Sequence, residues 1–167
     1  MKALEPPDCH HLSAALGWFE LANWQEANEE LEKIAPTLRA HPDVLEVRCA
    51  IYAKLERWET VLDIAKAISQ LDPDRTFGPI YLACAFHKLK RTEEARLVLV
   101  KILNRFPTDW LVRFNLACYE CQLGNQAVAW AYLAEAFELG DAKAVKLLAL
   151  NAYDLEPFWK QIGDMKP

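Results

Sequence analysis

The chain has 167 residues, of which 53% are hydrophobic and 26% charged, and its net charge is −5. This composition is typical of a folded globular protein that is long enough to bury a core, and it argues against a disordered chain. The net negative charge and the lack of a Lys/Arg-rich run argue against a nucleic-acid-binding protein, which normally carries a basic patch.

Apolar residues recur at the three- and four-residue spacing of helices, as in Val44, Val47, Ile51 and Leu55. Glycine is scarce, and the Asn-Gly and Asp-Gly pairs that mark hairpin turns do not occur. The sequence therefore predicts an all-α protein.

The helical pattern repeats every 34 residues, which predicts helix pairs over roughly 8–41, 42–75, 76–109 and 110–143. Pro73 and Pro107 are also 34 residues apart, and each is expected to end the second helix of a pair because proline cannot continue a helix. The columns that share this period are Ala27/Val61/Ala95/Ala129, Leu21/Leu55/Leu89/Leu123 and Ala15/Cys49/Ala83/Ala117.

These columns resemble the tetratricopeptide-repeat (TPR) family, whose pattern is aromatic-x2-Leu-Gly/Ala-x2-Tyr, then Ala-x3-Phe, then Pro. Repeats 42–75 and 76–109 match well, and repeats 8–41 and 110–143 match more loosely. The resemblance covers about four-fifths of the chain. The chain is similar to the small stand-alone bacterial TPR proteins. It implies one α-solenoid domain over 1–167, with the first helix of each pair on the concave wall.

Residues 144–167 are expected to form a capping helix and a folded-back tail. Asp141 can N-cap the helix, over roughly 142–152, and Phe158, Trp159 and Ile162 of the tail can cover its apolar side. The residues expected in the core are Leu55, Leu82, Leu89, Leu99, Ile102, Leu116, Leu123 and Leu133.

No phosphate-cradling glycine loop, GxSxG or HExxH motif is present, so no enzyme activity and no cofactor are expected. Two charges occupy packing positions, Arg48 and Glu120, and we expect each to have a partner, with Lys143 or Lys146 near Glu120.

The TPR resemblance implies that the concave groove binds a partner. TPR proteins that bind a peptide's C-terminal carboxylate place Lys, Arg and Asn in the middle columns of the groove. These columns here hold Leu, Ile, Phe, Ala and Cys together with one acidic residue, Glu46, which leaves a mainly apolar groove. We therefore expect a non-enzymatic protein–protein interaction module that holds an apolar segment of a protein or peptide. The expected contact residues are Phe77, Ile80, Cys84, His87, Phe114 and Cys118.

Two alternatives remain open at this stage. The first is a self-assembling scaffold or homodimer through the convex face of the helix near 96–103, where Leu97 and Val100 face outward. The second is a zinc or redox protein, because two short pairs lie one repeat apart on neighbouring helices. Cysteine is also a common small apolar filler, however, and a redox pair needs the start of a helix. The candidate ligands are Cys84, His87, Cys118 and Cys121.

The five cysteines lie mostly inside apolar runs, as expected for reduced thiols rather than a secreted disulfide framework. The first residues, MKALEPPDCHH, lack the apolar segment of a signal peptide, and no run approaches the length of a membrane span. We therefore expect a cytoplasmic protein with no membrane partner.

Overall fold

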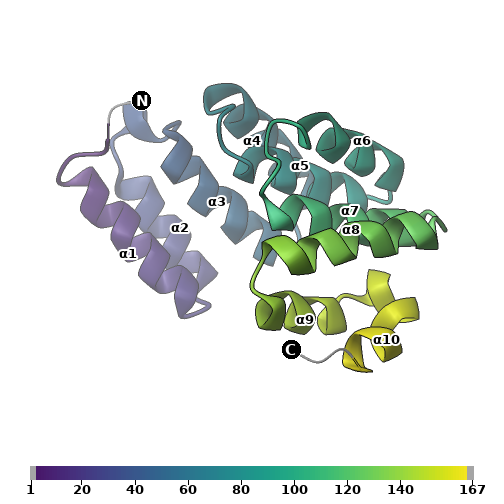
Figure 1. Cartoon of the computed structure of the whole chain (residues 1–167). Coiled ribbons are helices and arrows are strands. Elements are labelled where there is room, and N and C mark those ends of the chain that lie inside the picture. The colour runs from purple at the N-terminus through teal and green to yellow at the C-terminus, as the bar shows by residue number, and fades with distance from the viewer. Residues whose placement is uncertain (1–2, 165–167) are drawn as a thin grey trace. The chain divides into compact units, whose positions relative to one another are not determined.

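The structure is a computed structural model that describes residues 3–164, and within this range all regular elements are helices (Figure 1). The all-α fold expected from the sequence is therefore confirmed. The helices of the repeat region are α1 (Asp8–Glu20) and α2 (Trp24–Lys33), α3 (Pro42–Lys54) and α4 (Trp58–Leu71), α5 (Phe77–Lys88) and α6 (Thr92–Ile102), and α7 (Trp110–Gln122) and α8 (Gln126–Leu139), with the 3₁₀ helix η1 (Pro36–Leu38) between α2 and α3.

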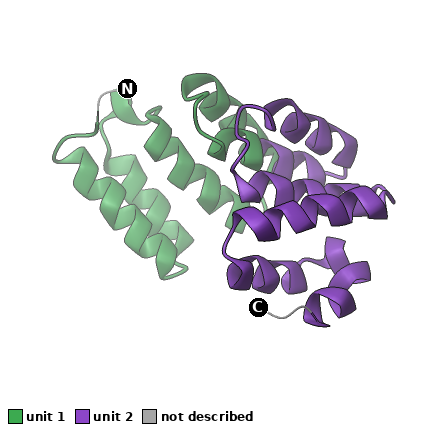
Figure 2. Ribbon diagram, in the orientation of Figure 1, with its two compact units in different colours: residues 1–81 green, residues 82–167 purple. Residues whose placement is uncertain are grey.

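The chain forms two compact units, residues 1–81 and residues 82–167 (Figure 2). We call them unit 1 and unit 2. Helix α5 begins in unit 1 and ends in unit 2. The single-domain organisation expected from the sequence stays a prediction.

The turn inside each helix pair has the same backbone conformation in all four pairs. Ala22, Glu56, Lys90 and Gly124 have φ of 57°, 55°, 64° and 83°, and they are 34 residues apart. In each turn the residue that follows the left-handed one donates a backbone hydrogen bond to the carbonyl five residues before it, as from Asn125 to Glu120 at 2.8 Å. This is the Schellman arrangement that ends a helix. The 34-residue period of the sequence is therefore also a period of the backbone.

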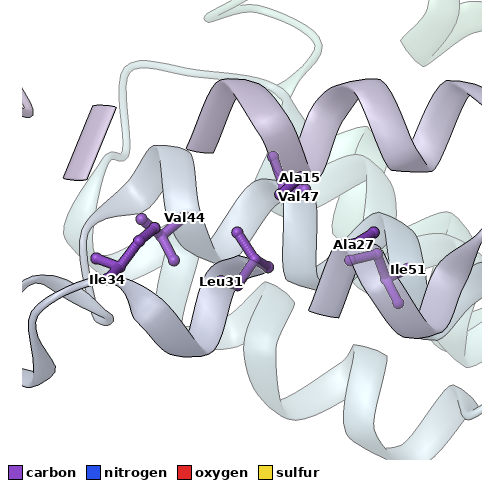
Figure 3. Close-up of a cluster of buried hydrophobic side chains, with 7 residues drawn as sticks. All are labelled: Ala15, Ala27, Leu31, Ile34, Val44, Val47 and Ile51. Carbon is purple, nitrogen blue, oxygen red and sulfur yellow. The ribbon is translucent and has the colours of Figure 1, made fainter. Parts of the chain in front are cut away.

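Small residues lie where the two helices of a pair approach each other. Two helices can pack closely only where no bulky side chain holds them apart. In unit 1, Ala15 of α1 and Ala27 of α2 lie in a cluster with larger buried residues of α2 and α3, such as Leu31 and Val47 (Figure 3). The two small-residue columns found in the sequence are fully buried in all four pairs: Ala15, Cys49, Ala83 and Ala117, and Ala27, Val61, Ala95 and Ala129.

The residues predicted for the core are fully or partly buried, except for Leu55, which is exposed. Leu99, Leu116 and Leu133 are fully buried, as expected. Leu55 is 45% exposed, because it is the C-cap residue of α3, where the chain begins to turn away from the helix pair. The remaining residues of the predicted core are partly buried: Leu82, Leu89, Ile102 and Leu123.

The capping region of unit 2 has the expected form. Asp141 Oδ1 accepts a hydrogen bond from the Ala144 N–H at 2.8 Å and begins α9 (Ala142–Asn151). The chain then turns through η2 (Tyr153–Phe158) into α10 (Trp159–Asp164), which packs back on α9. Phe158 and Ile162 are buried, and the Trp159 indole N–H donates to the Ala149 carbonyl at 3.0 Å.

The left-handed turns lead to a stability prediction. An L-residue in the left-handed region is strained by about 1 kcal/mol, so Lys90→Gly is expected to raise the free energy of unfolding by about 1 kcal/mol. Gly124→Ala is expected to lower it by a similar amount. No atom lies within 4 Å of a Cβ built on Gly124, so this effect isolates the backbone. Urea unfolding followed by circular dichroism measures both, and a destabilised Lys90→Gly variant would contradict the prediction.

Candidate functional site

The predicted groove residues of unit 2 are mostly covered in the structure. Phe114 and Cys118 on α7 are 8% and 5% exposed, and Cys84 on α5 is partly buried. The Cys84 thiol donates to Asn115 Oδ1 at 3.6 Å and accepts from the Tyr119 hydroxyl at 3.6 Å. This section of the wall is therefore packed against its own neighbours.

The chain's own tail lies on this section of the wall. Element η2 packs against α7, and Asp154 Oδ2 lies 3.0 Å from His87 Nε2. The other ring nitrogen of His87, Nδ1, lies 3.1 Å from Thr92 Oγ1, and the ring packs at 4.9 Å on Tyr119. Both nitrogens of His87 thus have partners within unit 2. Sequence reasoning missed Asp154, because it lies outside the repeats and belongs to no column.

The thiols of unit 2 are held in their protonated form. Burial raises the pKa of Cys84 and of Cys118, and the Asp154 carboxylate raises the pKa of Cys118 further. Burial and Asp154 also raise the pKa of Cys121. Asp109 caps α7 through bonds to the N–H groups of Leu111 and Val112, so Cys118 lies about two turns inside the helix. A reactive redox cysteine needs a lowered pKa at a helix start, and this arrangement is the opposite.

The four residues weighed as a zinc site do not form one cluster. Within residues 3–164, no three His, Cys, Asp or Glu side chains come together in a way that could hold a metal ion. His87 points to Thr92 and Asp154, whereas Cys84 points to Asn115 and Tyr119. The structure gives the zinc alternative no support.

The buried Glu120 and the partly buried Arg48 each have a charged partner in the structure. Glu120 is 5% exposed, accepts a hydrogen bond from Asn125 Nδ2 at 2.8 Å and lies 3.4 Å from Arg96 Nε. These two residues, rather than the lysines expected from α9, hold its carboxylate. Arg48 pairs with Glu32 at 2.9 Å. Both charges thus serve packing within their own units.

An open apolar pocket lies in unit 1, on the face that α1 and α3 share with the start of α5. Its volume is about 140 Å³. Leu16 at its edge is 45% exposed, and the ring of Phe77 stacks on Tyr81 at 4.2 Å. Of the residues expected in the groove, Phe77 lines this pocket, while Ile80, one turn further along α5, is 6% exposed. The lining residues are Leu16, Phe19, Glu46, Val47, Ala50 and Phe77.

Two close contacts fix the side chains that line this pocket. Phe19 packs against Trp24 with ring centroids 5.1 Å apart. Gly78 lies so close to α4 that a Cβ at this position would be 2.6 Å from Ser69 Oγ. A side chain at position 78 would therefore force α5 and α4 apart next to Phe77. The pocket is therefore built from packed helices and contains no loop.

Glu46, which lines the pocket, belongs to a group of three carboxylates around Arg75 that we call the rim. Arg75 Nη1 lies 2.9 Å from Asp43 Oδ1 and 2.8 Å from Glu46 Oε1, and Arg75 Nε lies 3.6 Å from Asp72 Oδ2. One guanidinium therefore faces three carboxylates. Burial raises the pKa of Glu46, Asp43 and Asp72 raise it further, and Arg75 opposes them. Sequence reasoning listed Glu46 in a groove column but did not identify this acidic group.

The outer face of α6 carries the apolar residues singled out for self-assembly. Leu97 is 44% exposed and Val100 is 38% exposed. Their neighbours on the same helix include Arg96, which lies 3.5 Å from Glu93. The two residues thus face outward within unit 2, as the sequence predicted.

The state of the cysteines leads to a prediction about alkylation. At pH 7 in the native protein, Cys118 is expected to react with iodoacetamide at least about ten-fold more slowly than Cys9, because it is buried and little thiolate forms. Mass spectrometry of peptides from timed samples measures both rates. In urea all five cysteines should react, which serves as the control. Rapid native labelling of Cys118, or a Cys118–Cys121 disulfide formed in air, would restore the redox alternative.

No protein-family model and no curated protein matches the sequence. In the part of the chain that the structure describes, no helix has both the length and the apolar character needed to cross a membrane.

Solved structures do match the fold. The thermophilic TPR protein TTC0263 of Thermus thermophilus has a TM-score of 0.76 at 18% identity, over 93% of this chain and 83% of that one. MamA of Desulfovibrio magneticus has a TM-score of 0.71 at 13% identity, over 97% and 96%. YrrB, a TPR protein described as having an unusual peptide-binding site, has a TM-score of 0.66 at 17% identity, over 87% and 75%. With identities this low the likeness establishes the fold alone, and this chain has the tetratricopeptide-repeat fold.

Proposed function

We propose that this protein is a non-enzymatic interaction module that holds one apolar side chain of a partner protein or peptide in the pocket of unit 1. The observation that carries the proposal is the pocket itself, which is apolar over most of its lining and open at Leu16. An open apolar site of this kind on a packed scaffold commonly marks a binding site.

The size of the pocket indicates what it holds. Its volume is about 140 Å³. An apolar cavity of about 150 Å³ lined by aliphatic and aromatic residues holds a benzene ring. The pocket therefore suits one phenylalanine ring or one branched aliphatic side chain. Burying such a side chain contributes about 1.5–3 kcal/mol, so a single anchor gives weak binding and a natural partner needs further contacts.

Phe77 keeps its place in this proposal, and the other expected contact residues take a different role. Ile80, Phe114 and Cys118 are buried, so a partner reaches them only after other side chains move. Cys84 and His87 are engaged within unit 2. The proposal therefore places the first partner contact on Leu16, Ala50 and Phe77 of unit 1 rather than on the section covered by η2. The peptide-binding site reported for YrrB, a structure of the same fold, is consistent with this kind of function.

The pocket leads to a binding prediction with a peptide probe. The capped peptide acetyl-Gly-Gln-Phe-Gln-Gly-amide is expected to bind with a Kd on the order of 10 mM, and its alanine counterpart should not bind measurably. Titration followed by two-dimensional ¹H–¹⁵N NMR measures this weak affinity. The largest shifts are expected at the amides of Leu16, Val47, Ala50 and Phe77.

Filling the pocket tests the location. Ala50→Phe is expected to abolish binding of the phenylalanine peptide, because the new ring occupies the space of the ligand. Ala131→Phe places the same ring at an exposed alanine of α8 and serves as the matched control. Circular dichroism checks that both variants keep their helices. If Ala50→Phe binds as well as the unchanged protein, the pocket is not the binding site.

Self-assembly through α6 is the second candidate, favoured by the exposure of Leu97 and Val100. A contact between two copies through this face would cover both side chains. Under this candidate, size-exclusion chromatography with light scattering shows a dimer at about 10 µM or above, as is common for specific interfaces of moderate strength. The double variant Leu97→Glu with Val100→Glu then returns it to a monomer. A monomer in the unchanged protein at these concentrations excludes this candidate.

A further inference from the structure

We propose that the partner segment carries a lysine or arginine beside its apolar anchor, and that this cation lies on the carboxylates at the rim of the unit 1 pocket. This inference rests on the proposed function, because it specifies the chemistry of the partner that the pocket holds.

The group of charged residues next to the pocket is negative overall. Asp43, Glu46 and Asp72 lie around one cation, Arg75, with distances of 2.8–3.6 Å. Three carboxylates against one guanidinium leave an excess of two negative charges. His41 Nδ1 also lies near this group, 3.6 Å from Asp43 Oδ2. The excess of carboxylates over guanidinium groups therefore attracts a second cation.

Glu46 joins the apolar pocket to the acidic rim. This residue both lines the pocket and belongs to the acidic rim, so an apolar anchor and a neighbouring basic side chain can be bound at the same time. Its side chain is 20% exposed, which leaves the carboxylate partly desolvated. Charge pairs in such surroundings are stronger than pairs in open water. A cation next to Glu46 offsets the repulsion from Asp43 and Asp72.

Negative charge is concentrated in the N-terminal half of the chain. Residues 1–81 contain 8 Lys and Arg against 14 Asp and Glu, a net charge of −6, whereas residues 82–167 contain 11 against 10, a net charge of +1. The acidic excess of the protein thus belongs to the unit that contains the pocket. A field of one sign raises the association rate of partners of the opposite sign and disfavours acidic ones.

The charge around the pocket disfavours two other kinds of partner. An acidic segment would bring a like charge to a rim that is already negative. A segment with apolar residues alone would fill the pocket but leave the excess carboxylates without a partner. A basic residue next to an aromatic or branched aliphatic residue satisfies both parts of the site.

The test compares four capped peptides that differ only at the anchor and its two neighbours. They are acetyl-Gly-X-Phe-X-Gly-amide with X as Lys, Gln or Glu, and the Lys peptide with alanine in place of phenylalanine. NMR titration of the whole protein measures each Kd. At about 50 mM salt, the Lys-Phe-Lys peptide is expected to bind about three- to ten-fold more tightly than Gln-Phe-Gln, and Glu-Phe-Glu most weakly. At about 500 mM salt this order should collapse, because the charges are screened.

A pair of double variants locates the effect. Asp43→Asn with Glu46→Gln is expected to reduce the advantage of the Lys peptide over the Gln peptide, measured as the ratio of their two Kd values in the same variant, to less than about two-fold. Glu59→Gln with Asp63→Asn makes the same change of net charge at exposed positions of α4 outside the pocket. This control should keep most of the advantage. Circular dichroism verifies that both double variants are folded.

The outcomes separate this inference from the proposed function. Equal binding of the Lys and Gln peptides, with loss only in the alanine peptide, overturns the basic-partner inference and keeps the apolar pocket. Tightest binding of the Glu peptide also overturns it. If no phenylalanine peptide binds, or if binding persists in Ala50→Phe, the proposed function fails and the inference fails with it. Equal loss of the Lys advantage in both double variants would show that net charge alone, and not the rim, selects the peptide.

Discussion

The close approach of the two helices within each pair is the constraint on which the other features depend. A helix pair has an apolar stripe that it cannot bury alone, so the helices must pack closely on each other and on a neighbouring pair. The fully buried small residues at the crossings, such as Ala15 and Ala27 in the first pair, make this approach possible. The left-handed turns at Ala22, Glu56, Lys90 and Gly124 then return the chain at the angle that the packing requires.

The same packing gives the two units different surfaces. In unit 2, η2 lies on α7, and the contact of Asp154 with His87 places a charged residue of the tail on the wall. The pKa values of Cys84, Cys118 and Cys121 on this wall are raised, so their thiols stay protonated and are poor nucleophiles. In unit 1, the face of α1 and α3 beside Phe77 remains open and apolar, with carboxylates around it. The chemistry available for binding is therefore an apolar anchor next to a negative charge.

The function proposed here depends on position rather than on reactive groups. Leu16, Ala50 and Phe77 are unremarkable residues in isolation, and they form a pocket only because α1, α3 and α5 hold them against one another. Similarly, Asp43, Glu46 and Asp72 would be ordinary surface carboxylates if Arg75 did not gather them. Rigid helices favour binding at such a site, because the protein loses little conformational entropy when a partner binds.

The fold class and the helix pairs could be predicted from the sequence alone, because the 34-residue period records contacts that every pair makes with its neighbours. The capping helix was also predictable, through Asp141, as were the outward-facing positions of Leu97 and Val100. The exposure of Leu55, the contact of Asp154 with His87, and the grouping of three carboxylates around Arg75 became known only from the folded chain. A repeat pattern describes what the repeats share, whereas the tail and the turns between repeats make contacts that occur once. The burial of a repeated position such as Leu55 likewise depends on the neighbours that the folded chain places around it.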